Sequence, residues 1–436
     1  MTRQSAKRQT GARQTGARQT VARQSAPANP AWKLPPGIAR ALSEGRYTPG
    51  RGPWYLSRIL PTHLPERREW LESSGVSRWA IDRGYDTLAS GVVLKRVGDG
   101  GTGSDGSAER AGSREGTGHG GGTDSSGGRG GRTGPRSEID TGAYCHCIIT
   151  RARAQLIKHH ETCVLGGWGA AAFHGLKYWA DSAPVLLLSY QVAKRDSDDS
   201  KVAAKHPLRA AVREFPKHFD IERDTVCPDP EFPHHRVVSA PFALVQCLRS
   251  VLSGKHTWYV SDIPGLTRQE VRAIQLIDAF IMCSTVTRAE ILRAARGMVR
   301  HRTLNRLLRF ASVGAESPRE TELRLFIRDL LPKGHQWQTQ VEVELAPDES
   351  TGQVRRTFFD TACPTLKIGL YYDGAHHMNA DQAEKDFEQI QDLHDGRWTV
   401  IRVDKKLMAN PEKMLRQIRN ATTRAGAKSE TWDQSA

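Results

Sequence analysis

The chain has 436 residues, 38% of them apolar, and carries a formal net charge of +15. This length exceeds that of a typical single domain, so we expect two or three folded units in a multidomain α+β protein. No apolar run reaches the ~18 residues that a membrane span requires, and no apolar segment follows the basic start. The composition therefore argues against a membrane protein and predicts a cytoplasmic one without a membrane partner.

The positive charge is concentrated at the N-terminus. Residues 1–58 hold eleven Lys and Arg against Glu44, a balance of +10, which leaves +5 for the other 378 residues. Residues 8–24 repeat a polar pentad (RQTGA, with variations) that has little to bury, so 1–30 are predicted to be a disordered arm. Such an arm would attract nucleic acid through its phosphates, although a solubilising tail fits the composition equally well.

The seven cysteines are an odd number without CxxC spacing, which indicates a reducing compartment rather than a disulfide framework. One cluster raises the question of zinc. It lacks the usual spacing of a zinc knuckle, so buried thiols on a strand and a helix are the favoured interpretation. The cluster comprises Cys145, His146, Cys147, His159, His160 and Cys163.

Residues 31–97 have the pattern of a winged helix-turn-helix. A helix is expected at 65–71, a turn at 75–77 with Ser77 as N-cap, a recognition helix at 77–89 and a strand at 92–97. Residues 98–137 contain sixteen glycines and are predicted to be a disordered insertion in the wing, whose second strand would return at 143–149. A generic three-element packing unit fits this pattern as well. The candidate DNA contacts are Arg78, Arg83, Lys95 and Arg96.

Residues 150–315 are predicted to be a mainly helical middle region without catalytic spacing. Residues 316–425 are predicted to form a separate α/β domain with a mixed four-stranded sheet, followed by a tail at 426–436. In this domain Ser317 and Glu320 form a candidate capping box, and the apolar spacing that follows gives one buried helix face. The expected strands are 336–343, 356–361, 366–372 and 398–403, with helices at 381–394 and around Met414 to Ile418.

Two acidic side chains in this region point to chemistry. Asp360 interrupts an apolar strand, where an unpaired charge would cost several kcal/mol unless it lies at an edge or binds a cation. Asp373 ends the next strand, so a hairpin would bring the two carboxylates together. Such a pair suits Mg²⁺, which would activate water and stabilise charge on a phosphate. His376 is a candidate for proton transfer, while Asp373-Gly374 also fits an ordinary turn.

The order of these motifs resembles an uncharacterised actinobacterial family related to the very-short-patch repair endonucleases, in the PD-(D/E)XK nuclease superfamily. The resemblance rests on Ser317-Pro318-Arg319-Glu320, Asp360, Tyr371-Tyr372-Asp373-Gly374-Ala375-His376, Asp386 and 397–403. It implies a restriction-endonuclease-like fold in which Glu320, Asp360, Asp373 and His376 form the catalytic site and Asp360 and Asp373 hold Mg²⁺. Residues 75–78 and 164–176 resemble, more loosely, the winged-helix region of abortive-infection type IV antitoxins.

The chain departs from the family pattern at two positions. Tyr371 stands where the family carries a Glu, although the repair endonucleases also lack that Glu. Gln389 stands where relatives often carry an Arg. The sequence therefore supports two hypotheses: a DNA-binding, Mg²⁺-dependent endonuclease, and a non-enzymatic, antitoxin-like regulator that keeps the nuclease fold as a scaffold. A third is an interaction protein whose arm recruits partners. The oligomeric state is not predicted.

Overall fold

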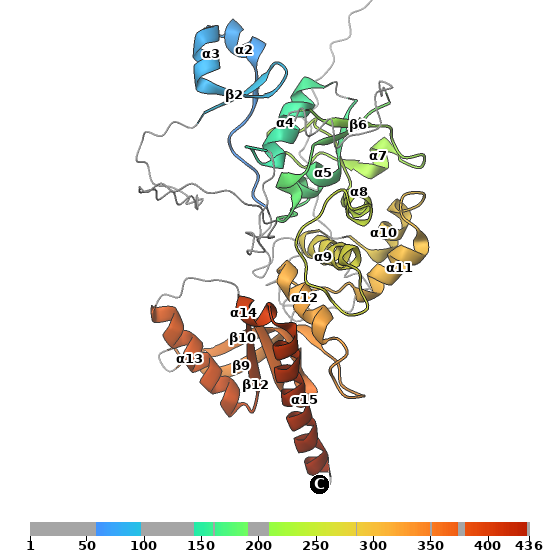
Figure 1. Ribbon diagram of the computed structural model, residues 1–436. Coiled ribbons are helices and arrows are strands. Elements are labelled where there is room, and N and C mark those ends of the chain that lie inside the picture. The colour runs from blue at the N-terminus through green and yellow to red at the C-terminus, as the bar shows by residue number, and fades with distance from the viewer. Residues whose placement is uncertain are drawn as a thin grey trace, which may run out of the picture.

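The computed structural model describes residues 58–96, 144–159, 162–190, 209–284, 286–348, 351–373 and 380–433 (Figure 1). Side chains at 380–386 and 427–433 are outside this description. The predicted arm at 1–30, the Gly-rich insertion at 98–137 and His376 also lie outside the described residues. The described part is an α+β structure with three sheets. Among its helices, none is long and apolar enough to cross a membrane.

The N-terminal unit is a small sheet with two short helices. Its elements are β1 (Glu66–Arg67), α2 (Arg68–Ser73), α3 (Arg78–Gly84), β2 (Tyr85–Ala89) and β3 (Val92–Lys95). The strands pair antiparallel in the order β1-β3-β2. Ser77 caps α3 as predicted, because its hydroxyl accepts a hydrogen bond from the Ala80 N–H. Leu71, Ile81 and Val93 fill the space between the helices and the sheet.

Two predictions for this unit are wrong. The helix expected at 77–89 ends at Gly84, because 85–89 pair with β3 instead. The strand expected at 143–149 is not a strand: α4 (Ile148–Lys158) begins there, and β2 is the hairpin partner of β3. The turn of that hairpin contains Gly91 at φ +74°, a conformation that favours glycine. Leu88, Val92 and Leu94 pack against α4, so the sheet is attached to the middle region.

The middle region combines helices with a sheet that the sequence did not predict. Five short strands lie in the order β6-β5-β4-β8-β7. They are β4 (Val164–Gly166), β5 (Leu186–Leu188), β6 (Ala211–Arg213), β7 (Thr225–Val226) and β8 (Val237–Val238). The accompanying helices are α5 (Gly167–Phe173), η1 (Ala180–Ser182), α7 (Ile221–Asp224), α8 (Ala240–Leu252), α9 (Arg268–Cys283), α10 (Arg288–Ala294) and α11 (His301–Phe310).

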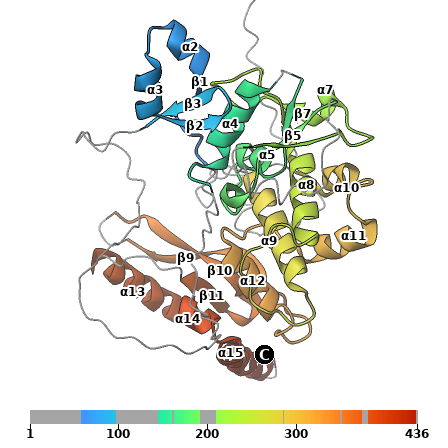
Figure 2. The same ribbon diagram turned by 45° about the horizontal axis from the view of Figure 1, so that its top comes forward.

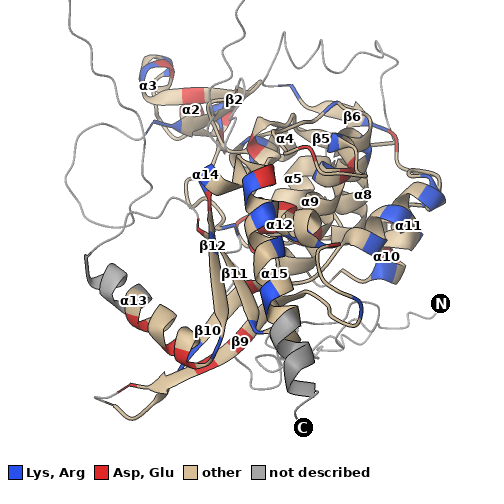
Figure 3. Cartoon of the chain, turned by 60° about the horizontal axis from the view of Figure 1, so that its bottom comes forward, with Lys and Arg blue, Asp and Glu red and all other residues tan. Residues whose placement is uncertain are grey.

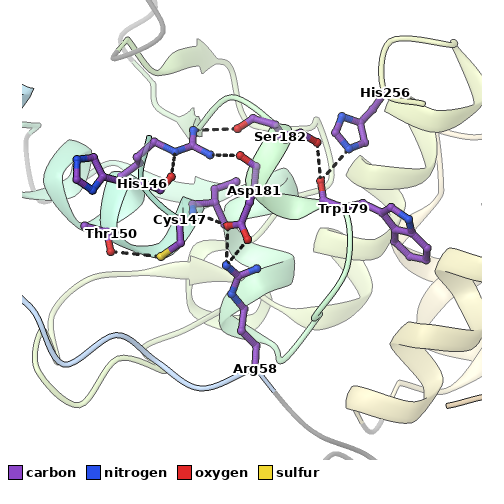
Figure 4. Close-up of polar contacts among 11 residues, drawn as sticks. Arg58, His146, Cys147, Thr150, Trp179, Asp181, Ser182 and His256 are labelled. Atoms are coloured by element: carbon purple, nitrogen blue, oxygen red, sulfur yellow. Dashed lines mark hydrogen bonds and ion pairs between the residues drawn. The ribbon is translucent and has the colours of Figure 1, made fainter. Parts of the chain in front are cut away.

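Asp181 in η1 joins the segment at Arg58 and the start of α4 to the middle region (Figure 4). Its carboxylate accepts hydrogen bonds from the Arg58 guanidinium at 2.5 and 2.7 Å and from the Ile148 N–H at 2.8 Å. Arg151 donates to the carbonyls of His146, Asp181 and Ala183. The network ties Arg58 and the start of α4 to η1 and the residue after it, so we assign it a stabilising role.

The C-terminal region has the predicted mixed four-stranded sheet. Its strands are β9 (Gln338–Pro347), β10 (Val354–Cys363), β11 (Ile368–Asp373) and β12 (Thr399–Asp404), in the order β12-β11-β10-β9. The pair β11 and β12 is parallel and the other pairs are antiparallel. The helical elements are α12 (Pro318–Ile327), η2 (Pro364–Leu366), α13 (Ala380–Asp395), α14 (Lys405–Met408) and α15 (Pro411–Asp433). Thus α15 extends through most of the predicted tail.

Helices cover both faces of this sheet. Leu393 of α13 packs with Val341 and Phe359 on one face, and α12 and α15 contact β11 on the other. The apolar core on the second face is continuous with that of the middle region, from Ile148 to Ile418. The expected boundary near residue 316 is therefore no break in the core. The N-terminal unit lies at the opposite end of the molecule from this sheet (Figure 2).

Candidate functional site

The first turn of α12 positions Glu320. Ser317 is the N-cap, and its hydroxyl accepts a hydrogen bond from the Glu320 N–H at 3.3 Å. The Glu320 carboxylate in turn accepts from the N–H of Glu316, at 2.8 Å, one residue before the cap. The capping box is thus half formed as predicted, because its second hydrogen bond goes to Glu316 instead of Ser317.

Asp360 lies where β10 separates from β11. The ladder between these strands ends at Thr361 and Leu370. Beyond it, the Asp360 Oδ2 accepts a hydrogen bond from the Tyr372 N–H at 2.6 Å, in place of a backbone partner. On the other side of β10, Gln340 of β9 has φ +49°, so the ladder is also irregular there. Asp360 therefore lies where backbone pairing is interrupted, and the Tyr372 N–H fixes its carboxylate there.

The structure brings Asp360 together with Glu320 and with Glu316, a residue that the sequence analysis missed. Burial, followed by the negative charge of Asp360, raises the pKa of Glu316 to about 8. The same two causes raise the pKa of Glu320 well above its usual range. Burial raises the pKa of Asp360 to about 7 against the effect of the Tyr372 N–H, and Asp373 adds to the rise. We call Glu316, Glu320 and Asp360 the acidic cluster.

Glu316 Oε1 distinguishes this cluster from an ordinary set of paired acids. The atom is buried, and within the described residues it has no hydrogen-bond partner. A buried carboxylate oxygen without a donor is costly, and an unobserved ligand or water is the usual explanation. The signal in the sequence was weak, because Glu316 differs from a solvent-exposed Glu only by standing next to Ser317-Pro318.

Asp373 is near enough to affect the pKa of Asp360, but it has a partner of its own. Arg402 on β12 holds both oxygens of its carboxylate, at 2.6 and 3.1 Å. This bidentate pair neutralises Asp373 and leaves it outside the acidic cluster. The fourth predicted member of the site, His376, lies beyond the described segment that ends at Asp373.

The described residues contain no group of three or more His, Cys, Asp or Glu side chains arranged to hold a metal ion. This finding covers Glu316, Glu320, Asp360 and Asp373 as they stand. It also covers the cysteines and histidines that raised the question of zinc, apart from His160, which is outside the description. Of the thiols in that set, Cys145 is exposed, Cys147 is half-buried and Cys163 is buried.

Tyr371 and Gln389, the two departures from the family pattern, are bonded to each other. The Gln389 side-chain amide donates to the Tyr371 hydroxyl at 3.0 Å, and Thr357 shares a hydrogen bond with the same hydroxyl at 2.8 Å. The Tyr371 ring lies 4.7 Å from that of Phe359, centroid to centroid. Tyr371 therefore belongs to the apolar cluster between the sheet and α13, and its burial raises its pKa to about 12.

The four candidate DNA contacts of the N-terminal unit have different surroundings. The side chain of Arg78 is 81% exposed, with a 3.4 Å ion pair to Glu72. Arg83 lies over the exposed ring of Trp79, 5.3 Å from its centroid, and Lys95 is exposed at the end of β3. Arg96 instead donates to Asp86 and to the Arg83 carbonyl, both at 2.7 Å. Its guanidinium thus ties α3 to the sheet.

Comparisons with family models, with curated proteins and with solved structures gave no match to this chain. The resemblances stated from the sequence therefore stay predictions, and the argument for function depends on the geometry of the acidic cluster.

Proposed function

We propose that this protein binds DNA and hydrolyses its phosphodiester bonds with a divalent metal ion at the acidic cluster. The observation that carries the proposal is the meeting of Glu316, Glu320 and Asp360, which come from two segments about forty residues apart. The negative charge of Asp360 adds to burial in raising the pKa of both glutamates. Perturbed carboxylates that share one site are typical of functional centres, because folding gains little from burying like charges together.

The chemistry of the donors suits a hard cation, although binding would require the three side chains to converge further, since they form no metal site as they stand. Three carboxylates supply only oxygen ligands, as Mg²⁺ prefers, and the Oε1 atom of Glu316 has no donor among the described residues. Asp360 with Glu320 and Glu316 would hold the ion, and Asp373 would join them once Arg402 releases it. When bound, Mg²⁺ lowers the pKa of a bound water and neutralises charge on the scissile phosphate.

The remaining roles belong to the chain itself. With a pKa near neutrality, Asp360 can exchange a proton at physiological pH, and His376 stays a candidate for the same task. Arg402 would bind a phosphate oxygen when it leaves Asp373, since a guanidinium pairs with carboxylate and phosphate alike.

The N-terminal unit supports DNA binding. The order β1, α2, α3, β2, β3 is the order expected of a winged helix, with β2 and β3 as the wing, and α3 presents exposed Arg78 and Arg83. A non-enzymatic regulator is the second candidate function. Two observations favour it. Asp373 is paired with Arg402, and no group of three or more potential ligands in the described residues is arranged to hold a metal ion.

The test is cleavage of supercoiled plasmid in Mg²⁺ or Mn²⁺ by the wild-type protein and by Asp360→Asn. We expect the wild type to nick the plasmid and the variant to lose at least a hundredfold in rate. Asp395→Asn, at an exposed position at the end of α13, is the matched control and should cleave normally. Cleavage that persists in Asp360→Asn would refute the assignment.

The same protein samples decide the second candidate. Selective DNA binding without cleavage in any divalent metal would establish the regulator instead. In either case, Arg78→Ala with Arg83→Ala should remove selectivity if α3 reads the site.

A further inference from the structure

A second basic surface lies on α10 and α11, far in sequence from the predicted DNA contacts. Residues 288–309 contain seven arginines and a single acidic residue, Glu290. Figure 3 shows these positive residues gathered on two neighbouring helices, whereas α13 and β9 carry acidic residues at a different place on the molecule. We call this surface the α10–α11 patch.

The packing of α11 explains why its arginines face outward. Leu304, Leu307 and Leu308 are buried, and they define the inner side of the helix. Arg302 and Arg309 are exposed on the other side. They are seven residues apart, which is about two helical turns or ~10 Å along one face.

The acidic and hydrogen-bond-accepting side chains near the patch already form hydrogen bonds or ion pairs within the protein. The Glu290 carboxylate accepts hydrogen bonds from the backbone and hydroxyl of Thr287, at 2.8 and 2.7 Å. Arg306 pairs with Glu270 at 2.7 Å, and Arg288 donates to Asn305 at 3.1 Å. These two arginines therefore have structural roles.

Four other arginines of the patch, Arg296, Arg300, Arg302 and Arg309, are exposed and form no ion pair with any described residue. Elsewhere in the described structure many arginines do have a carboxylate partner. Examples are Arg58, Arg68, Arg153, Arg223, Arg268, Arg324 and Arg355. Concentrating unpaired arginines on α11 and on the segment that joins it to α10 costs self-repulsion, which a polyanion would remove.

We propose that the α10–α11 patch is a second, sequence-independent contact surface for the backbone of duplex DNA. This inference rests on the proposed function, because it takes DNA as the partner. Duplex DNA presents one phosphate charge per ~1.7 Å of axis, and arginine forks match phosphate oxygens. The patch would hold the duplex while α3 reads its bases, since phosphate contacts fix position and base contacts give specificity.

The experiment is a fluorescence-anisotropy titration of labelled duplex DNA in EDTA at several salt concentrations. The test variant is Arg296→Gln/Arg302→Gln/Arg309→Gln. The matched control, Lys333→Gln/Arg416→Gln/Arg419→Gln, removes the same charge at exposed positions elsewhere. All six side chains are exposed, so neither variant should lose stability. A melting temperature equal to that of the wild type verifies that each variant is folded.

We expect the test variant to bind at least tenfold more weakly near 100 mM salt. Its slope of log K against log salt should fall by about 2–3, because each lost phosphate contact contributes ~0.9. The control should change the slope by less than one. Equal binding by the test and control variants would overturn the inference but leave the proposed function intact, whereas a wild-type protein that binds no DNA would refute both.

Tighter binding to single-stranded RNA or to phosphatidylserine vesicles than to duplex DNA, lost in the same test variant, would also overturn it. In that outcome the patch would serve another polyanion. EDTA separates this experiment from cleavage, since binding is measured without a metal ion.

Discussion

At the scale of single residues, the end of a strand ladder determines the environment of the Asp360 carboxylate. Its carboxylate takes the N–H of Tyr372 because the ladder of β10 and β11 has ended, and it faces the two Glu side chains at the start of α12. The pKa of each carboxyl in the acidic cluster is raised, so folding favours the protonated form over the ionised form. The cluster is therefore a cost to folding at neutral pH in the absence of a cation.

This cost has a defined pH dependence. The pKa of Asp360 rises from about 4 in the unfolded chain to about 7 in the fold. Its contribution to stability is thus fully present below about pH 4 and is lost as the pH rises through about 7. Asn cannot ionise, so Asp360→Asn should be more stable than the wild type by roughly 2–4 kcal/mol at pH 8 and nearly as stable as the wild type at pH 4. Urea unfolding in EDTA at both pH values measures this, and a variant less stable at pH 8 would contradict it.

Tyr371 differs from Asp360, because its ring packs in the apolar cluster between the sheet and α13. Tyr371→Phe removes the hydroxyl shared by Thr357 and Gln389, which should cost about 1 kcal/mol of unfolding free energy. Plasmid cleavage should be unchanged, because the hydroxyl lies on the α13 side. A large loss of cleavage without a loss of stability would place Tyr371 in the site after all.

At the scale of elements, the sheet of the site depends on one close approach. Gly369 of β11 lies under the ring of Phe359, and a Cβ at this position would be 2.2 Å from it. Phe359 is fully buried and also packs on Trp398, so it has no room to move. The strand that ends in Asp373 is held in register by this contact.

Gly369→Ala should therefore destabilise the protein by about 3 kcal/mol or more, through overpacking. Gly352→Ala, at an exposed turn where a Cβ would meet nothing, is a comparison for the loss of a glycine. Its φ of +66° should cost only about 1 kcal/mol. Thermal unfolding of both variants measures the difference, and equal melting temperatures would show that Phe359 can yield.

The elements of the C-terminal region could be predicted because its strands have six to ten residues and its helices have clear ends. The sheet of the middle region could not, since strands of two or three residues show no alternation. Tertiary pairing also decided against the helix at 85–89. In α12 the apolar spacing could not show that polar residues also face α9, where the buried carboxylate of Asp278 accepts hydrogen bonds from both Thr321 and Arg324.

The candidate site could be anticipated only in part. The order of motifs singled out Glu320 and Asp360, but it could not single out Glu316 or the pairing of Asp373 with Arg402. Those contacts depend on how far β10 and β11 diverge and on the register of β12, which no local pattern encodes.

At the scale of the whole molecule, the middle and C-terminal regions share one apolar core. Leu323 and Phe326 of α12 belong to the same cluster as residues of α8 and α9. Buried Glu322 on α12 also bonds to Gln275 of α9, at 2.9 Å. Separating the two regions would expose this interface and leave buried polar groups without partners.

A fragment of residues 316–433 should therefore fail to fold stably by itself, with a melting temperature at least 10 °C below that of the whole chain. Circular dichroism of the fragment and of the whole chain measures this. A fragment that melts cooperatively at the temperature of the longer chain would show that the C-terminal region is an independent domain.

The most direct test of the central claim, that the acidic cluster binds a divalent cation, is the melting temperature with and without 10 mM Mg²⁺ at pH 8 and at pH 5. For a dissociation constant of about 0.1 mM, Mg²⁺ would add ~2.7 kcal/mol, so we predict a rise of several degrees at pH 8. The rise should disappear at pH 5, where the cluster is protonated, and in Asp360→Asn. An equal rise in Asp360→Asn, or no rise in the wild type at pH 8, would contradict the claim.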